Sequence, residues 1–112
     1  MRIALLSDVH GNLPAFRAVL ADVESAGAEQ VLCLGDLVGY GAQPDGCVAL
    51  ARERCDVCLA GNHDLVVTGA IDIADFSPSA ASAAVWTREH ISADSLEYLR
   101  GLEPVVDRKS VV

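Results

Sequence analysis

Three short apolar segments, residues 2–6, 31–34 and 57–60, constrain this fold most, because each is followed directly by polar residues that can bind metal ions. Aliphatic runs of this length are typical of strands that are buried on both faces of a parallel sheet. Residues 12–27 and 44–54, which lie between them, have helical spacing of apolar residues and helix-terminating residues. The order strand, helix, strand, helix, strand predicts an α/β fold with a parallel sheet and right-handed crossovers.

The sequence GNHD closes the third predicted strand, and the segments that follow it are predicted to be mainly helical. Ser77 and Pro78 predict the start of an alanine-rich helix that runs to about Ile91. Its buried side is expected to carry Ala81, Ala84, Val85 and Trp86. Ser92 or Asp94 then caps a shorter helix that carries Leu96, Leu99 and Leu102.

Metal-ligand side chains follow all three predicted strands. Asp8 and His10 follow the first strand, Asp36 follows the second, and Asn62 and His63 follow the third. Because sites in open parallel sheets form outside the carboxyl ends of adjacent strands, these side chains are expected to converge. Each residue taken singly has an ordinary explanation, such as a loop cap or a surface histidine. Their occurrence at three consecutive strand ends indicates one site.

The residue types in these motifs suit a divalent metal. Imidazole with carboxylates favours manganese, iron, zinc or nickel over calcium, which prefers oxygen ligands alone. Two metals about 3.5–4 Å apart need a bridging anion, and Asp36 in the middle motif is the candidate. Asn62 can supply a neutral ligand that also touches the substrate. Four glycines allow sharp backbone turns and close approach of phosphate oxygens: Gly35, Gly39, Gly41 and Gly61.

The three motifs resemble the signature of the calcineurin-like metallophosphoesterases, in which D-x-H, G-D and G-N-H-[DE] occur in this order. Here they read Asp8-Val9-His10, Gly35-Asp36 and Gly61-Asn62-His63-Asp64. The longer stretches SDVHGNLPA and LGDLVGYGAQP resemble the small bacterial phosphodiesterase-like branch. The resemblance covers residues 1–106. It implies the N-terminal half of an α/β sandwich, with a β-α-β-α-β parallel sheet followed by two helices.

The same resemblance implies a dinuclear metal centre. In it Asp8 and His10 bind the first of two divalent ions, Asp36 bridges both, and Asn62 binds the second. The implied reaction is the hydrolysis of a phosphodiester or phosphomonoester by a metal-bridging hydroxide. Two cations would also locally outweigh an acidic protein surface.

Three further residues are expected to act on the substrate. By resemblance, His63 lies beside the leaving group as general acid or transition-state stabiliser, with Asp64 nearby to orient it. Tyr40 could stack on a base or ring of the substrate, or could simply pack its loop, and both readings stay open.

The composition limits which binding partners and which cellular compartment we expect for the chain. With 112 residues, 52% apolar and 21% charged, the chain is expected to fold as one small domain or part of one. The net charge of −8 argues against binding to a nucleic-acid backbone or an anionic membrane. The N-terminus does not resemble a signal peptide, and no apolar stretch approaches the roughly 18 residues needed to span a bilayer. We therefore expect a cytoplasmic protein that acts on a small phosphate ester.

The four cysteines are expected to be free thiols, since the chain shows no export signal. Cys55 and Cys58 have CxxC spacing, which can bind zinc or act in redox chemistry. Because no second CxxC follows and the surrounding run is a predicted strand, we interpret them as structural thiols.

The chain departs from the family pattern in its second half. The family needs three further histidine ligands there, whereas His90 lies in a predicted helix and is interpreted as a helix-end residue. Residues 103–106 are expected to start another strand. We expect residues 1–106 to be a truncated metallophosphoesterase domain that binds metal weakly by itself. Residues 107–112 are interpreted as a non-native tail, for which a translated sequencing adapter is the hypothesis, and the alternative is a genuine short basic C-terminus.

Two other classes of protein share some of these features. A non-catalytic phosphoesterase-like module that binds a nucleotide or a partner would share the fold without needing the complete metal set. A receiver-type signalling domain is also doubly wound and acidic. A receiver would need paired acids after the first strand and a lysine after its last strand. Here Asp8 pairs with His10 instead, and Lys109 is the only lysine.

Overall fold

A parallel sheet of three strands organises residues 1–104, the part of the chain that this computed structural model describes. Its strands lie side by side in the order β1 (Ile3–Leu6), β2 (Gln30–Cys33) and β3 (Val57–Cys58). Leu6 pairs with Cys33, and Cys33 pairs with Cys58, so the carboxyl ends of the strands lie close to one another. The predicted α/β fold with a parallel sheet is confirmed.

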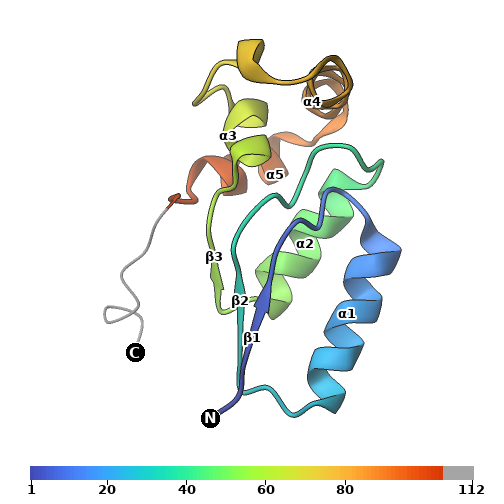
Figure 1. The fold of residues 1–112 in the computed structure, drawn as a ribbon, viewed down its shortest axis with the longest axis vertical. Coiled ribbons are helices and arrows are strands. Elements are labelled where there is room, and N and C mark those ends of the chain that lie inside the picture. Colours follow the sequence, from blue (N-terminus) through green and yellow to red (C-terminus); the bar gives the residue numbers. More distant parts are fainter. Residues whose placement is uncertain (105–112) are drawn as a thin grey trace.

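The two crossover helices, α1 (Leu13–Ser25) and α2 (Pro44–Arg54), lie on the same side of the sheet (Figure 1). The side chain of Asn12 caps α1 by accepting a hydrogen bond of 3.2 Å from the Ala15 N–H, and Gly27 follows the helix with a φ of +73°. Phe16 and Leu20 are the buried residues of α1 and join the core. Both helices have the predicted positions.

The strands are less buried than expected. Leu5 is 64% exposed and Ile3 is exposed as well, so β1 is not covered on both faces. Successive side chains of a strand point to opposite faces, and within residues 1–104 the crossover helices cover only one of them. The third strand is also shorter than predicted and ends at Cys58. Beyond it, the Ala60 N–H donates a hydrogen bond of 2.8 Å to the carbonyl oxygen of Glu103.

A short helix, α3 (Asn62–Thr68), was not predicted; the sequence GNHD was expected only to close the third strand. It starts within the third motif and ends at Gly69, whose φ is +86°. A 3-10 turn, η1 (Ile73–Asp75), follows it. In Figure 1 these elements lie beyond the carboxyl ends of the strands.

The two predicted later helices are α4 (Pro78–His90) and α5 (Ala93–Arg100). Ser77 and Ser92 cap them, as their side-chain oxygens accept hydrogen bonds of 3.3 and 3.1 Å from backbone N–H groups. The predicted buried side of α4 is partly wrong, because Val85 and Trp86 are exposed. The residues that α4 buries are Ala80, Ala84 and Thr87, a set at helical spacing whose small side chains allow close packing on α3.

Two further expectations concern the cysteines and the C-terminal residues. All four cysteines are free, with Cys33 and Cys47 buried and the other two half-buried against the core. The expected tail at 107–112, and residues 105–106 of the strand expected at 103–106, lie outside the described residues. Within residues 1–104 no helix is long and apolar enough to cross a membrane.

Candidate metal centre

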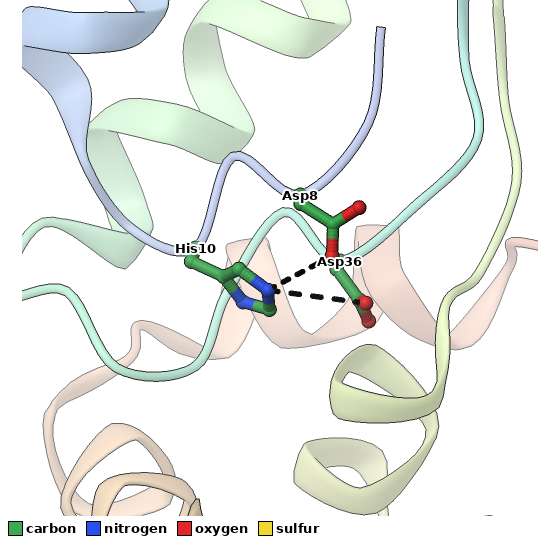
Figure 2. A group of neighbouring side chains, drawn as sticks. All are labelled: Asp8, His10 and Asp36. Atoms are coloured by element: carbon green, nitrogen blue, oxygen red, sulfur yellow. Dashed lines mark hydrogen bonds and ion pairs between the residues drawn. The ribbon is translucent and has the colours of Figure 1, made fainter.

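Asp8, His10 and Asp36 come together at the carboxyl ends of β1 and β2 (Figure 2). The Nε2 atom of His10 lies 3.1 Å from Oδ1 of Asp8 and 4.0 Å from Oδ2 of Asp36. One ligand atom from each residue lies within 4.8 Å of both others. Among residues 1–104 this is the only such group of three or more His, Cys, Asp and Glu side chains. The structure thus brings three of the four predicted metal ligands together.

Backbone hydrogen bonds between the first two motifs hold these side chains in place. The N–H of Asp8 donates to the carbonyl oxygen of Gly35 over 3.1 Å, and the N–H of His10 donates to that of Asp36 over 2.8 Å. A third bond of 2.8 Å joins Gly11 to Leu37. The two loops therefore continue the pairing of β1 and β2 beyond the ends of the strands.

The backbone is strained at this site. Four non-glycine residues of the described chain have a positive φ: Asp8 at 59°, His10 at 49°, Asp36 at 58° and Tyr40 at 64°. Each such conformation costs about 1–2 kcal/mol for a residue with a Cβ atom. Strain of this kind concentrates where the surrounding structure fixes side chains for function. All four residues were singled out from the sequence as candidates for the site.

The donor set fits a divalent ion. Two ligand atoms that each lie about 2.1 Å from the same ion, and that subtend a right angle at it, are about 3 Å apart. Nε2 of His10 and Oδ1 of Asp8 are 3.1 Å apart, which is close to this separation. On the other ring edge, Nδ1 of His10 lies 3.1 Å from the carbonyl oxygen of Val38. If Nδ1 carries the proton, it donates a hydrogen bond to this carbonyl oxygen, and Nε2 is then the ring nitrogen that can bind a metal. Within residues 1–104 neither carboxylate forms an ion pair with an arginine or lysine.

The two carboxyl groups differ in their surroundings. The hydroxyl of Ser7 donates a hydrogen bond of 2.7 Å to Oδ2 of Asp8 and lowers the pKa of that exposed carboxyl. Burial raises the pKa of Asp36, although a hydrogen bond from the His63 N–H acts in the opposite direction. A bound cation would favour the charged form of both groups.

Asp64 is fully buried and joins the second motif to the third. Its carboxylate accepts hydrogen bonds from the backbone N–H groups of Asp36 at 2.8 Å, Gly61 at 2.9 Å and Val38 at 3.2 Å. Burial nevertheless raises its pKa to about 6. The expectation was that Asp64 orients the His63 ring, but these bonds go to the backbone instead. The Asp64 carboxylate therefore joins the loops of the second and third motifs.

His63 is the second residue of α3 and is buried. Its backbone N–H donates to Oδ1 of Asp36 over 2.9 Å, and its ring centroid lies 4.7 Å from that of His10. Burial lowers the pKa of the imidazole. Its Nδ1 atom is buried without a hydrogen-bond partner among the described residues.

The two remaining candidates, Asn62 and Tyr40, are exposed at the rim of the site. Asn62 lies between Gly61 and His63, both of which contact the Asp36 carboxylate. Tyr40 is 55% exposed, and its ring centroid lies 5.2 Å from that of His10 and 4.9 Å from that of His63.

An open cleft of about 490 Å³ lies beside these side chains. It is lined by residues of the first motif and of the loop after β2, among them Asp8, His10, Asn12, Tyr40 and Gln43. The cleft adjoins the metal-ligand cluster, so a ligand held there would reach Asp8 and His10.

One residue at the site was not found from the sequence. Phe76 follows η1, and its ring centroid lies 4.7 Å from that of His63. No motif includes Phe76, and it lies thirteen positions after His63, so only the tertiary structure reveals this contact.

Carboxylate and imidazole side chains that could hold a metal ion, on loops that follow adjacent parallel strands, define an α/β protein with a candidate metal site at the carboxyl edge of its sheet. More narrowly, the model of the calcineurin-like phosphoesterase family matches residues 1–106, and the chain belongs to this family. The membership inferred from the three motifs is confirmed, and the described fold matches the N-terminal part of a metallophosphoesterase.

Similar proteins are about twice as long as this chain. An uncharacterized protein of Methanocaldococcus jannaschii is 40% identical over 105 residues, which cover 94% of this chain and 43% of the relative. The crystal structure of a metallophosphoesterase from Sphaerobacter thermophilus has a TM-score of 0.77 and 39% identity, and the match covers 96% of this chain and 44% of that one. A protein of Pyrococcus horikoshii shares the fold, with a TM-score of 0.76, 23% identity, and coverage of 90% and 47%. The chain thus spans less than half the length of these relatives.

Proposed function

We propose that the whole protein is a dinuclear metal-dependent phosphoesterase and that this chain carries the first part of its active site. The observation that supports this most is the cluster of Asp8, His10 and Asp36 at the edge of the sheet. In this proposal Asp8 and His10 would hold one divalent ion, Asn62 would hold the second, and Asp36 would be a ligand of both. When bound, such ions supply a water activated for attack and neutralise phosphate oxygens.

The chain's own residues contribute positioning and proton chemistry. His63 lies next to Asp36 and His10, where its ring can donate a proton or a hydrogen bond to the leaving-group oxygen. Asp64 keeps the loops of the second and third motifs together through its three backbone hydrogen bonds. We assign Asp64 a supporting role in catalysis because it fixes the backbone on which Asp36 and His63 stand.

The substrate is proposed to be a small phosphate ester, either a diester or a monoester. Tyr40 exposes its ring to the cleft beside the metal ligands, and a base or other ring of the substrate could stack on it. The net charge of −8 disfavours binding to a nucleic-acid backbone.

The proposal is tested on the whole protein. Its metal content is measured, together with its turnover of an aryl phosphodiester and of an aryl phosphomonoester in the presence of manganese. We expect Asp36→Asn to lose bound metal and turnover together. Asp22→Asn makes the same chemical change at an exposed position of α1 and should change neither. Because the chain spans less than half of its relatives, we expect weak metal binding and little turnover from the 112 residues alone.

Two outcomes would change the proposal. Robust turnover by the 112-residue chain would contradict the view that residues 1–106 are only part of the domain. Two bound metals in the whole protein without turnover of either ester would favour a non-catalytic phosphoesterase-like module instead.

A further inference from the structure

The imidazole of His63 is held by packing and not by a carboxylate. Its Nδ1 atom has no hydrogen-bond partner among residues 1–104, although it is buried. The adjacent carboxylate, that of Asp64, is fully engaged with backbone N–H groups. A histidine ring whose nitrogen lacks such a partner can rotate about its side-chain bonds unless neighbouring atoms prevent it.

Backbone atoms close one side of the ring. A Cβ atom added to Gly39 would lie 2.5 Å from Nδ1 of His63 and 3.0 Å from its Cγ. Gly39 has a φ of +93°, a conformation that residues with a side chain rarely adopt. The Nδ1 edge of the imidazole therefore fits directly against the Gly39 backbone.

Three aromatic rings surround the rest of the imidazole. The ring centroids of His10 and Phe76 each lie 4.7 Å from that of His63, and the centroid of Tyr40 lies 4.9 Å away. The His10 ring makes an edge contact, with an interplanar angle of 76°. The rings of Phe76 and Tyr40 are tilted by 46° and 47°. An edge contact is one of the favoured geometries of aromatic pairs, and all three centroid distances lie within the range of roughly 4.5–7 Å that is usual for such pairs.

These three rings differ in what else they do. His10 is a predicted metal ligand and Tyr40 is exposed to the cleft, so a bound metal or substrate acts on both of them. Phe76 is half-buried and packs against the core. Its N–H donates to the carbonyl oxygen of Ile73 over 3.0 Å, and Asp72 caps the same 3-10 turn. Phe76 is thus the ring of the three that is anchored independently of the metal site.

We propose that Phe76 is a positioning residue for His63, holding the imidazole against the Gly39 backbone in the orientation that faces Asp36 and His10. This inference rests on the proposed function of His63. A small error in the placement of a catalytic group can cost a large factor in rate. The turn between α3 and α4 would then determine how well the site works, although it carries none of the motif residues.

The test compares Phe76→Leu with two other substitutions. Phe76→Tyr keeps an aromatic ring and should preserve the behaviour of the original protein. Phe16→Leu is the matched control, because Phe16 is the only other phenylalanine and lies buried on α1. It should lower the melting temperature without affecting His63.

Two measurements separate positioning from a general structural effect. In the 112-residue chain with 13C-labelled histidine, relaxation of the ring carbons should show a more mobile His63 in Phe76→Leu, with His90 unchanged. In the manganese-loaded whole protein, kcat should fall by about tenfold or more while KM and metal affinity stay within about twofold.

The proposal is overturned if the His63 ring stays as ordered in Phe76→Leu as in the original chain. It is also overturned if Phe16→Leu mobilises that ring equally, or if kcat is unchanged. A parallel fall in metal affinity would show that the substitution disturbs the whole site, and this too counts against a positioning role. If the protein hydrolyses no phosphate ester, the proposed function fails. The ring measurement then decides by itself whether Phe76 holds His63.

Discussion

The carboxylate of Asp64 accepts a hydrogen bond of 2.8 Å from the backbone N–H of Asp36, while the Asp36 carboxylate accepts one of 2.9 Å from the backbone N–H of His63. Each of the two carboxylates therefore bonds to the backbone of the other's motif. Two loops that lie far apart in the sequence are joined in this way next to the metal ligands. These hydrogen bonds fix the two loops relative to each other, because a buried polar group that loses its partner costs free energy.

The first prediction concerns Asp64. In Asp64→Asn, part of the side chain becomes a donor facing backbone N–H groups that are themselves donors. We expect the free energy of unfolding to fall by about 2 kcal/mol or more, because the bonds to a buried charged acceptor are weakened. Urea unfolding measures this. Asp75→Asn, at an exposed position of η1, is the control, and an equal effect of both changes would refute the structural role of Asp64.

The second prediction concerns Asp8 and metal binding. At a manganese concentration high enough to occupy the weak site of this chain, manganese should raise the melting temperature, and a chelator should reverse the effect, because an ion that binds only the folded state stabilises it. Asp8→Asn should abolish the rise. Without metal, Asp8→Asn should be slightly less stable than the original chain at neutral pH, since the hydrogen bond from the Ser7 hydroxyl favours the charged form of Asp8 in the folded state. A metal-dependent rise that persists in Asp8→Asn would argue against Asp8 as a ligand.

The third prediction concerns Gly61. A Cβ atom at this position would clash with Oδ1 of Asp36 and lie 2.5 Å from the Asp36 backbone nitrogen. Its φ of −83° is ordinary, so the effect of Gly61→Ala should be steric. We expect the metal-induced rise in melting temperature to be lost, together with about 1–3 kcal/mol of stability.

Gly101→Ala is the matched control for Gly61. Gly101 also has an ordinary φ, of −81°, and the nearest atom to an added Cβ would be 3.5 Å away. This variant should keep both its stability and its metal response. If Gly61→Ala behaves in the same way, the close approach of the third motif to Asp36 is not required.

The fourth prediction concerns pH and Asp45, which connects α2 to α5. Its Oδ1 accepts a hydrogen bond of 3.0 Å from the Ser92 N–H. Partial burial raises the pKa of Asp45, but hydrogen bonds from the Ser92 backbone and from the hydroxyls of Ser95 and Ser92 lower it by more, so the net pKa lies below its ordinary value. The folded state therefore favours the charged form.

Because the folded pKa is the lower one, the stability that Asp45 contributes is present above about pH 4 and is lost as the pH falls through the folded pKa. Asp45→Asn should be less stable than the original chain at pH 6, by less than about 1 kcal/mol since the group is exposed. The two should become equal near pH 2. Thermal unfolding across this range measures the difference, and a gap that does not narrow at low pH would contradict the assignment.

The sequence predicted the elements whose signals are local. The cap at Asn12 and the proline at position 44 are enough to place α1 and α2, because capping and helical spacing act within a few residues. The start of α3 was not predicted, because its cap is Gly61, which has no side chain, and Asp64 appeared to be a motif residue only. The buried face of α4 also depends on which helices pack against it.

The strand-end motifs determined, from the sequence alone, which side chains could bind metal and to which family the chain belongs. Parallel strands bring their carboxyl ends to one edge whatever the details of packing, so the convergence of Asp8, His10 and Asp36 could be foreseen. Only the tertiary structure decided that Asp64 bonds to backbone N–H groups and that Phe76 packs on His63. Those contacts join segments with no periodic or spacing relationship, and they follow from how the α3–α5 region folds over the site.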